Sequence, residues 1–283
     1  MQEVKIGYIF DRNKPDVEEK IFLRLAKKKN IDLIMFNVED FFNEDKIEEQ
    51  IKKCDIVFNN TAGYFALELV KTIEALGKKV IESSEVYYYT EDKWMFFLKC
   101  KEHNIPTPDT KLLSDNLNNA RKELEEFNHW PIILKRVEGC QGDFVEKAEN
   151  ANEAISLIKK FWKKGNERLP ILAQEFIKSP SYRVTTVGNK IIQTALKESH
   201  GWKSTAVYAE KLDKFDVDKS LERLVKKILK SCKLNICGID FLKKENKWIV
   251  LEVNSAPSFQ FFIEEQEKII DQVLDFLKTK AIS

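Results

Sequence analysis

Three oxygen-bearing side chains occupy two neighbouring apolar segments near the end of the chain. Asp240 lies inside the apolar run 236–242, and Glu252 and Asn254 lie at the end of the run that begins at Trp248. The polar KKEN segment between the runs predicts a β-hairpin, in which Glu252 and Asn254 share a face because strand side chains alternate. Asp240 is then directly opposite Glu252 or diagonal to it, at roughly 7–8 Å.

Two carboxylates and an amide oxygen are the hard ligands that Mg²⁺ takes when it also binds phosphates. Acids in otherwise buried strands are costly unless they are paired or bound to a cation. A hairpin at a sheet edge with its polar face in solvent explains the pattern equally well. The spacing therefore predicts either a magnesium site or an exposed sheet edge.

A second candidate site is a lysine beside a glycine-containing loop. Residues 132–134 are an apolar strand that ends in Lys135, the loop 138–142 follows, and a strand resumes at 145–147. Backbone N–H groups of such a loop can bind phosphate, and the lysine adds a positive charge. Since glycines in a hairpin loop commonly serve only the turn, this pattern alone leaves phosphate binding open.

The composition excludes several classes of protein. The 283 residues carry a net charge of +1, so there is no electrostatic reason to expect nucleic acid or membrane binding. No apolar run approaches a membrane span, and the N-terminal segment enters a strand without a signal peptide. The five cysteines form no CxxC pair, and the three histidines have no metal-ligand spacing. We expect a cytoplasmic protein with reduced thiols and without a histidine-based triad.

Strands and helices alternate in the first part of the chain, which predicts a small parallel sheet covered on both faces. Apolar strands at 4–10, 32–36, 55–59 and 79–81 enclose helices at 16–29, 46–53 and 65–76. No GxGxxG follows the first strand, so a dinucleotide fingerprint is absent. The segment 59–63 could line a substrate crevice, although a plain turn is the simpler interpretation.

The rest of the chain predicts two further units. Helices at 91–103, 116–127 and 151–163 surround the hairpin that carries Lys135, and a strand at 170–177 leads out of this unit. A hairpin at 182–187 and 190–196, a polar loop at 197–205, a helix at 217–232, the Asp240 hairpin and a closing helix at 264–280 follow. The expected domains are residues 1–88, 89–172 and 173–283.

Seven short motifs occur in an order that resembles the ATP-grasp superfamily, and within it the RimK-like amino-acid ligases. They are EDKW with Lys93, NIPTP, PIILKRVEGCQG with Lys135, AQEFI with Gln174 and Glu175, SYRV with Arg183, GID with Asp240, and LEVNSAP with Glu252 and Asn254. Each motif is weak alone, and their order and spacing carry the resemblance. It covers about two-thirds of the chain, from Glu91 to the closing helix.

The resemblance implies a fold and a set of roles. The fold is α/β, with a parallel-sheet N-terminal domain, a central lid and a C-terminal antiparallel-sheet domain, and ATP bound between the last two. Lys93 and Lys135 would neutralise phosphates under a loop with Gln141 and Gly142. The remaining implied roles are nucleotide binding for Gln174, Glu175, Phe176 and Ile177, Mg²⁺ (or Mn²⁺) binding for Asp240, Glu252 and Asn254, and catalysis for Arg183 and Lys203.

The implied reaction joins a carboxylate to an amine through an acyl phosphate and yields ADP and phosphate. Its substrates could be glutamate and a small molecule or protein tail, aminoadipate and a carrier protein, or two side chains of a precursor peptide. An ATP-binding regulatory protein without turnover is the alternative from a different class. Family analogy further suggests a homodimer or homotetramer.

Two positions depart from the family pattern. An Arg-Ser-Asn triplet is replaced by Lys203-Ser204-Thr205, and the acid two residues before Arg183 is replaced by Ser181. Lysine cannot supply the bidentate fork that arginine offers a carboxylate or phosphate. The use of ATP is therefore a firmer expectation than the addition of glutamate.

Overall fold

The N-terminal sheet of the computed structural model is parallel, with strand order β2-β1-β3-β4. The structure describes residues 3–11, 14–40, 43–139, 142–165, 167–203 and 209–282. Side chains alternate between the two faces of the sheet along β1. Tyr8 therefore packs on the first helix and Ile9 on the opposite face. The elements are β1 (Val4–Phe10), α1 (Val17–Lys28), β2 (Ile31–Asn37), α2 (Glu44–Ile51), β3 (Ile56–Asn59), α3 (Tyr64–Ala75) and β4 (Val80–Ile81).

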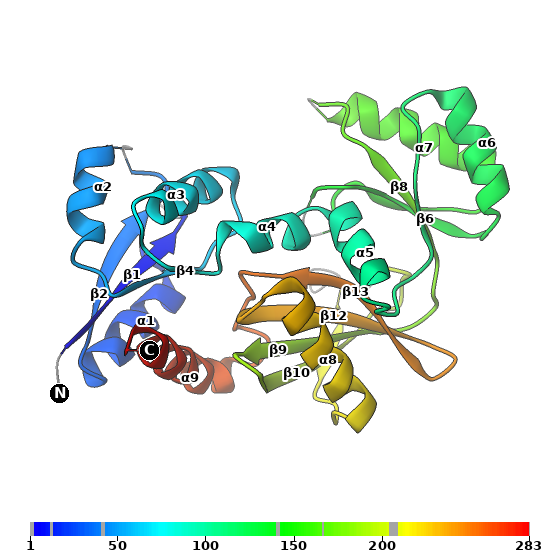
Figure 1. Cartoon of the computed structure of the whole chain (residues 1–283). Coiled ribbons are helices and arrows are strands. Elements are labelled where there is room, and N and C mark those ends of the chain that lie inside the picture. The colour runs from blue at the N-terminus through cyan, green and yellow to red at the C-terminus, as the bar shows by residue number, and fades with distance from the viewer. Residues whose placement is uncertain are drawn as a thin grey trace.

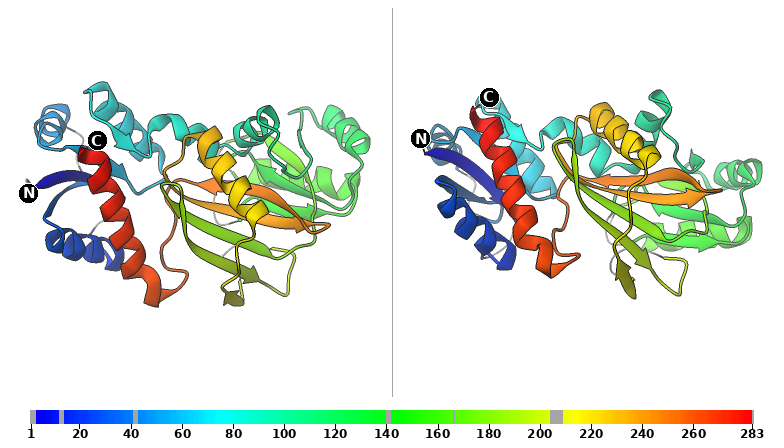
Figure 2. Two further views of the ribbon diagram at one scale, coloured as in Figure 1. Left: turned by 60° about the horizontal axis from the view of Figure 1, so that its bottom comes forward. Right: turned by 90° about the horizontal axis from the view of Figure 1, so that it is seen from below.

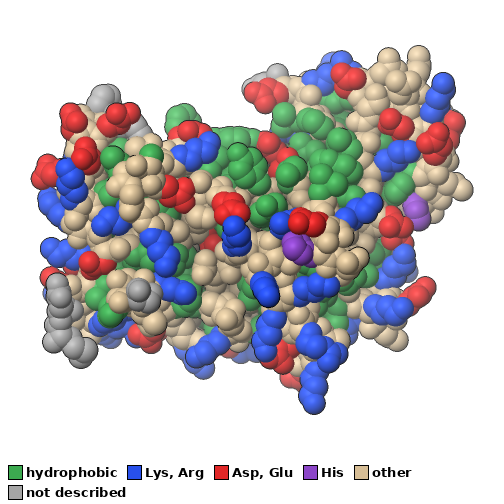
Figure 3. Space-filling view, in the orientation of Figure 1, with side chains coloured by type: hydrophobic (Ala, Val, Ile, Leu, Met, Phe, Trp, Pro, Cys, Tyr) green, Lys and Arg blue, Asp and Glu red, His purple; other side chains and the backbone are tan. Residues whose placement is uncertain are grey.

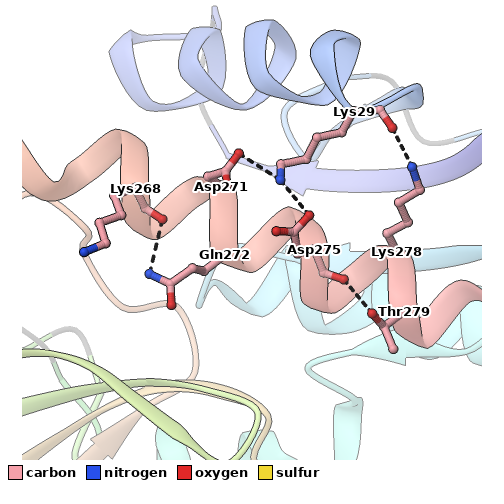
Figure 4. A network of polar contacts seen from close by, with 7 residues as sticks. All are labelled: Lys29, Lys268, Asp271, Gln272, Asp275, Lys278 and Thr279. Carbon is pink, nitrogen blue, oxygen red and sulfur yellow. Dashed lines mark hydrogen bonds and ion pairs between the residues drawn. The ribbon is translucent and has the colours of Figure 1, made fainter.

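The closing helix α9 (Ile263–Ile282) covers the same face of this sheet as α1, as two further views show (Figure 2). Ile270 and Leu277 are buried in one cluster with Phe22 of α1. Outside the core, Lys29 pairs with Asp271 and Asp275 of α9 (Figure 4). The expected division had grouped this helix with the C-terminal unit, but its apolar face is buried on the first sheet.

The central sheet is antiparallel, with order β5-β8-β6-β7. Two helices cover one of its faces, and Leu124 and Ile158 are buried between helices and sheet (Figure 1). The elements are β5 (Thr110–Leu112), α6 (Leu117–Phe127), β6 (Ile132–Arg136), β7 (Val145–Ala148), α7 (Ala151–Lys164) and β8 (Ile171–Glu175).

The C-terminal sheet is antiparallel, with order β11-β10-β9-β12-β13. One of its faces is apolar, and Ile239 and Phe241 of β12 pack there with Val86 and Phe96 from two preceding helices. The elements are α4 (Ser84–Thr90), α5 (Lys93–Glu102), β9 (Ser181–Val187), β10 (Lys190–Glu198), β11 (Lys211–Asp213), α8 (Lys219–Cys232), β12 (Ile236–Lys244) and β13 (Lys247–Asn254).

In the part of the chain that the structure describes, one parallel and two antiparallel sheets confirm the predicted α/β class and three-part architecture. The domain boundaries stay a prediction, since α5 of the expected central unit packs in the C-terminal core. The short elements α4, β5 and β11 were not expected from the sequence. Among the described residues, no helix has both the length and the apolarity needed to cross a membrane.

Candidate active site

The predicted hairpin is β12 and β13, and its turn is shorter than expected. Only Glu245 and Asn246 lie between the strands, with φ of 50° and 61°, which fits a two-residue primed turn. This turn alone would place Leu251 opposite Asp240. A bulge shifts the register between Asp240 and Phe241, so Asp240 faces Glu252 directly. The bulge therefore aligns the two carboxylates, a common use of bulges beside active sites.

The Asp240 carboxylate is buried and forms ion pairs with two basic side chains. The Nε and Nη2 of Arg183 donate to its two oxygens at 3.0 and 2.9 Å, and the Nζ of Lys197 donates at 2.7 Å. Burial by itself would raise the pKa of Asp240, but the charges and hydrogen bonds of Arg183 and Lys197 outweigh it and lower that pKa. Asp240 is therefore ionised and already paired within the protein.

Lys197 is a site residue that the sequence reasoning missed. It was expected at the start of a polar loop, whereas β10 continues to Glu198 and buries the lysine side chain. Alternation along β10 offered a signal, because Ala195 and Lys197 lie on one face if the strand extends two residues further. Glu91 was also missed. Glu91 and Lys197 both line a cavity between the central and C-terminal sheets, and burial raises the pKa of Glu91 to about 7.

Lys93 and Lys135 flank the predicted phosphate loop. Lys135 on β6 is buried, and desolvation lowers its pKa to about 8 although the charge of Glu252 opposes this shift. Lys93, the first residue of α5, donates from Nζ to the Gly139 carbonyl at 2.7 Å. Gly142 lies nearby with φ of 77° and also lines the cavity. Gln141, the other predicted loop residue, lies outside the described residues.

The end of β8 supplies the predicted nucleotide-binding segment. Gln174 donates from Nε2 to the Thr110 hydroxyl at 2.8 Å, and the Glu175 carboxylate pairs with Lys244. The Phe176 ring accepts a cation–π contact from the Nζ of a lysine on β7, 4.8 Å from the ring centroid. Ile177 is buried. These contacts anchor a strand end whose side chains and backbone border the cavity.

One cavity of about 320 Å³ brings the predicted residues together between the central and C-terminal sheets. Its size lies in the range of small-molecule sites. Lys203 lies at this cavity beside Trp202, with Nζ 5.2 Å from the ring centroid, but Ser204 and Thr205 lie outside the described residues. The predicted residues in its lining are Lys93, Lys135, Gly142, Gln174, Glu175, Phe176, Ile177, Arg183, Lys203, Asp240, Glu252 and Asn254.

The donor set fits a divalent cation bound together with phosphates. Among the described residues, no three His, Cys, Asp or Glu side chains converge on a metal position. Asp240 and Glu252 face each other, and Asn254 follows Glu252 on the same face of β13, where its amide oxygen could add a third ligand. Two carboxylates and one amide leave positions for phosphate and water oxygens, as Mg²⁺ sites with nucleotides do.

Hydrophobic side chains gather in the surface hollow between the part that carries α3 and the part that carries α6 and α7 (Figure 3). The exposed aromatic residues of the chain include Tyr64 and Phe65 of α3 and Tyr88 of α4. Tyr89, the next residue of α4, lines the cavity. The helix α4 thus carries aromatic side chains both in the cavity lining and on the surface.

A family model described as the RimK-like ATP-grasp domain matches residues 90–276. This range includes every predicted residue of the cavity lining and leaves out the N-terminal sheet. The chain belongs to this family. It is an ATP-grasp carbon–nitrogen ligase. The resemblance read from the motifs is confirmed.

Relatives of this RimK-like chain are named as glutamate ligases. A "Probable alpha-L-glutamate ligase" of Haemophilus influenzae is 24% identical over 232 residues, which are 79% of this chain and 74% of the relative. A "Coenzyme gamma-F420-2:alpha-L-glutamate ligase" of Methanocaldococcus jannaschii is 25% identical over 226 residues, covering 76% of each.

Solved structures show the same fold at low sequence identity. A RimK domain ATP-grasp protein from Sphaerobacter thermophilus has a TM-score of 0.76 and 14% identity, over 96% of this chain and 99% of that one. D-alanine–D-alanine ligase from Bacillus anthracis complexed with ATP has a TM-score of 0.73 and 15% identity, over 99% and 97%. The N-terminal parallel sheet is therefore part of the shared architecture.

Proposed function

We propose that the enzyme activates a carboxylate as an acyl phosphate and transfers the acyl group to an amine. A carboxylate oxygen attacks the γ-phosphorus of ATP, and the bond to the β-phosphate oxygen breaks to release ADP. The amine nitrogen then attacks the acyl carbon, phosphate leaves with the bonding electron pair, and the nitrogen loses a proton to solvent. An amide or peptide bond remains, and no covalent bond to the enzyme is required.

The observation that carries this proposal is the cavity between the two antiparallel sheets. Its wall holds Lys93, Lys135 and Lys197 together with the facing carboxylates of Asp240 and Glu252. Lysines suit the neutralisation of triphosphate oxygens, and the carboxylates suit a metal ion. Positioning and electrostatic stabilisation supply most of the catalysis in phosphoryl transfer, so this set of charges matches the reaction.

Asp240, Glu252 and Asn254 would hold Mg²⁺, which when bound neutralises charge on the β- and γ-phosphates. Gln174, Glu175, Phe176 and Ile177 would bind the adenine end of the nucleotide. Mn²⁺ would be an alternative metal, because it accepts the same oxygen ligands.

Arg183 is proposed as the main cation for the transferred phosphate and for the tetrahedral oxyanion. Its guanidinium lies over the C-terminal sheet and two of its nitrogens bind Asp240. Lys203 is the second candidate, because it lies at the same cavity. Donors that are positioned before the reaction stabilise developing negative charge at little reorganisation cost.

Glutamate is the amino acid we propose for addition, on the basis of the names of the relatives at 24% and 25% identity. The acceptor would be a small molecule, a peptide or a protein tail. The lysine at position 203 replaces an arginine of the family pattern, so a changed acceptor is compatible with the same ATP chemistry.

The test is ADP release in the presence of Mg²⁺ and ATP with a panel of carboxylates and amines, glutamate included. We expect an acid–amine pair to raise ADP release above background, and Glu252→Gln to abolish that increase while the fold is kept. The matched control is Glu125→Gln on the exposed face of α6, which should retain the wild-type rate. If ATP binds but no pair releases ADP, the proposed acyl-phosphate reaction is wrong.

A further inference from the structure

Gly238 occupies the centre of the charged face of the C-terminal sheet. It lies on β12 two residues before Asp240, so both residues point to the same face. Its neighbours in the sheet are Thr185 on β9 and Asn254 on β13. Arg183 is paired with Asp240 across β9 and β12 and is therefore diagonal to the glycine.

The Arg183 side chain fills the space that a side chain at position 238 would occupy. A Cβ placed on Gly238 would lie 1.9 Å from Nη1 of Arg183, 2.9 Å from its Cζ and 3.2 Å from its Cδ. Two of these distances are below any normal contact. Gly238 does not have a positive φ, so its backbone conformation is open to other residues. Space is therefore the physical reason for glycine here.

The space left by the glycine decides how the guanidinium is oriented. Nε and Nη2 bind the two oxygens of Asp240, which aligns the guanidinium edge with the carboxylate. The third nitrogen, Nη1, is the atom nearest to Gly238. The guanidinium also lies near the ring of Phe261, with Cζ 5.7 Å from the ring centroid. Bidentate pairing needs this coplanar approach, and a methyl group at position 238 would block it.

We propose that Gly238 is a positioning residue, which acts by leaving the space that the Arg183 guanidinium occupies while it pairs with Asp240. The inference rests on the proposed function for its catalytic consequence, because Arg183 would there contact the transferred phosphate. Its structural part, the dependence of the Arg183 position on Gly238, holds whatever the substrate is.

A double-mutant cycle tests the structural part without any substrate. Gly238→Ala is combined with Arg183→Lys, which removes Nη1, the atom that the new Cβ would approach to 1.9 Å, and replaces the planar guanidinium by a single ammonium on a flexible stem. We expect Gly238→Ala to lower the urea midpoint of unfolding in the wild-type background, and to lower it less than half as much in the Arg183→Lys background. The effects of residues in contact are not additive, so this coupling reports the shared space.

The matched control is Gly7→Ala on β1. A Cβ there would meet Phe36 at 2.9 Å and Val57 at 3.0 Å, which is also a close approach but lies in the N-terminal core. Gly7→Ala should lower the urea midpoint equally in the wild-type and Arg183→Lys backgrounds. Equal, additive effects of Gly238→Ala in both backgrounds would overturn the inference.

Two further outcomes test the role of Gly238 in positioning Arg183. If Gly238→Ala alone does not fold, a folded Gly238→Ala/Arg183→Lys double variant supports the inference, and an unfolded one overturns it. For folded Gly238→Ala we expect kcat for ADP release to fall by about a hundredfold, as for a misplaced catalytic group, with little change in the KM for ATP. An unchanged kcat would remove the catalytic consequence. Absence of activity in the wild type would count against the proposed function alone, because the unfolding cycle needs no turnover.

Discussion

Replacing Lys197 by methionine tests the charge balance around Asp240. Lys197 and Asp240 are each at most 3% exposed, and their charged atoms are 2.7 Å apart. Removing one partner of a buried pair typically costs about 3–5 kcal/mol. Arg183 still binds both oxygens of Asp240, and methionine keeps the apolar stem, so we expect a smaller loss of about 2 kcal/mol, the worth of one charged hydrogen bond.

The assay is urea unfolding of the metal-free protein at pH 7 and again near pH 3. The pKa of Asp240 is lowered in the folded protein, so its ion pairs stabilise the fold above the ordinary pKa of about 3.9. That stabilisation is lost as the pH falls through the folded-state pKa. The difference in unfolding free energy between Lys197→Met and wild type should therefore shrink at the lower pH.

Lys29→Met is the matched control, because Lys29 also forms ion pairs with carboxylates, in its case with two of them. Its Nζ lies 2.9 Å from Asp271 and 2.6 Å from Asp275, in the network that joins α1 to α9 (Figure 4). Those carboxylates are 45% and 60% exposed, so this substitution should cost less than about 1 kcal/mol. Equal costs for the two lysine variants, or a Lys197→Met cost below about 0.5 kcal/mol, would refute the reasoning from burial.

Two other buried groups give pH-dependent predictions. Burial raises the pKa of Glu82 to about 7, so this group should lower the unfolding free energy of the wild type as the pH rises from about 4.5 to 7. Glu82→Gln should remove a decrease on the order of 3 kcal/mol over this range in urea titrations. An unaltered pH dependence in that variant would contradict the assignment. Desolvation lowers the pKa of Lys135 to about 8, so the buried charge costs stability in the nucleotide-free protein. Lys135→Met should therefore stabilise that protein by about 1–3 kcal/mol and weaken ATP binding measured by calorimetry. A destabilised variant with normal ATP affinity would contradict both expectations.

Local patterns were enough to predict most strands and helices and the order of the site motifs. Alternation placed Glu252 and Asn254 on one face, and the sequence pattern located the described helices other than the short α4. These features depend on neighbours within a few residues, which a sequence displays directly. Short elements such as β5 and β11 were missed because three residues carry no clear period.

Contacts between distant residues were not readable in the same way. The helix α9 was expected with the C-terminal unit. Its apolar spacing shows that one face is buried, but it does not show which sheet that face packs against. Lys197 was expected in a loop, and its pairing with Asp240 spans 43 residues of the chain. The register of a strand pair and the length of a strand depend on partners that lie elsewhere in the sequence.

The sequence by itself determined that two carboxylates, an amide and a set of lysines stand in the order of an ATP-grasp ligase. The tertiary structure alone decided how they meet. A bulge at Leu251 places Glu252 opposite Asp240, and the missing side chain of Gly238 admits the guanidinium of Arg183. Both depend on the space and hydrogen bonds between strands, which are set only when the sheet has formed.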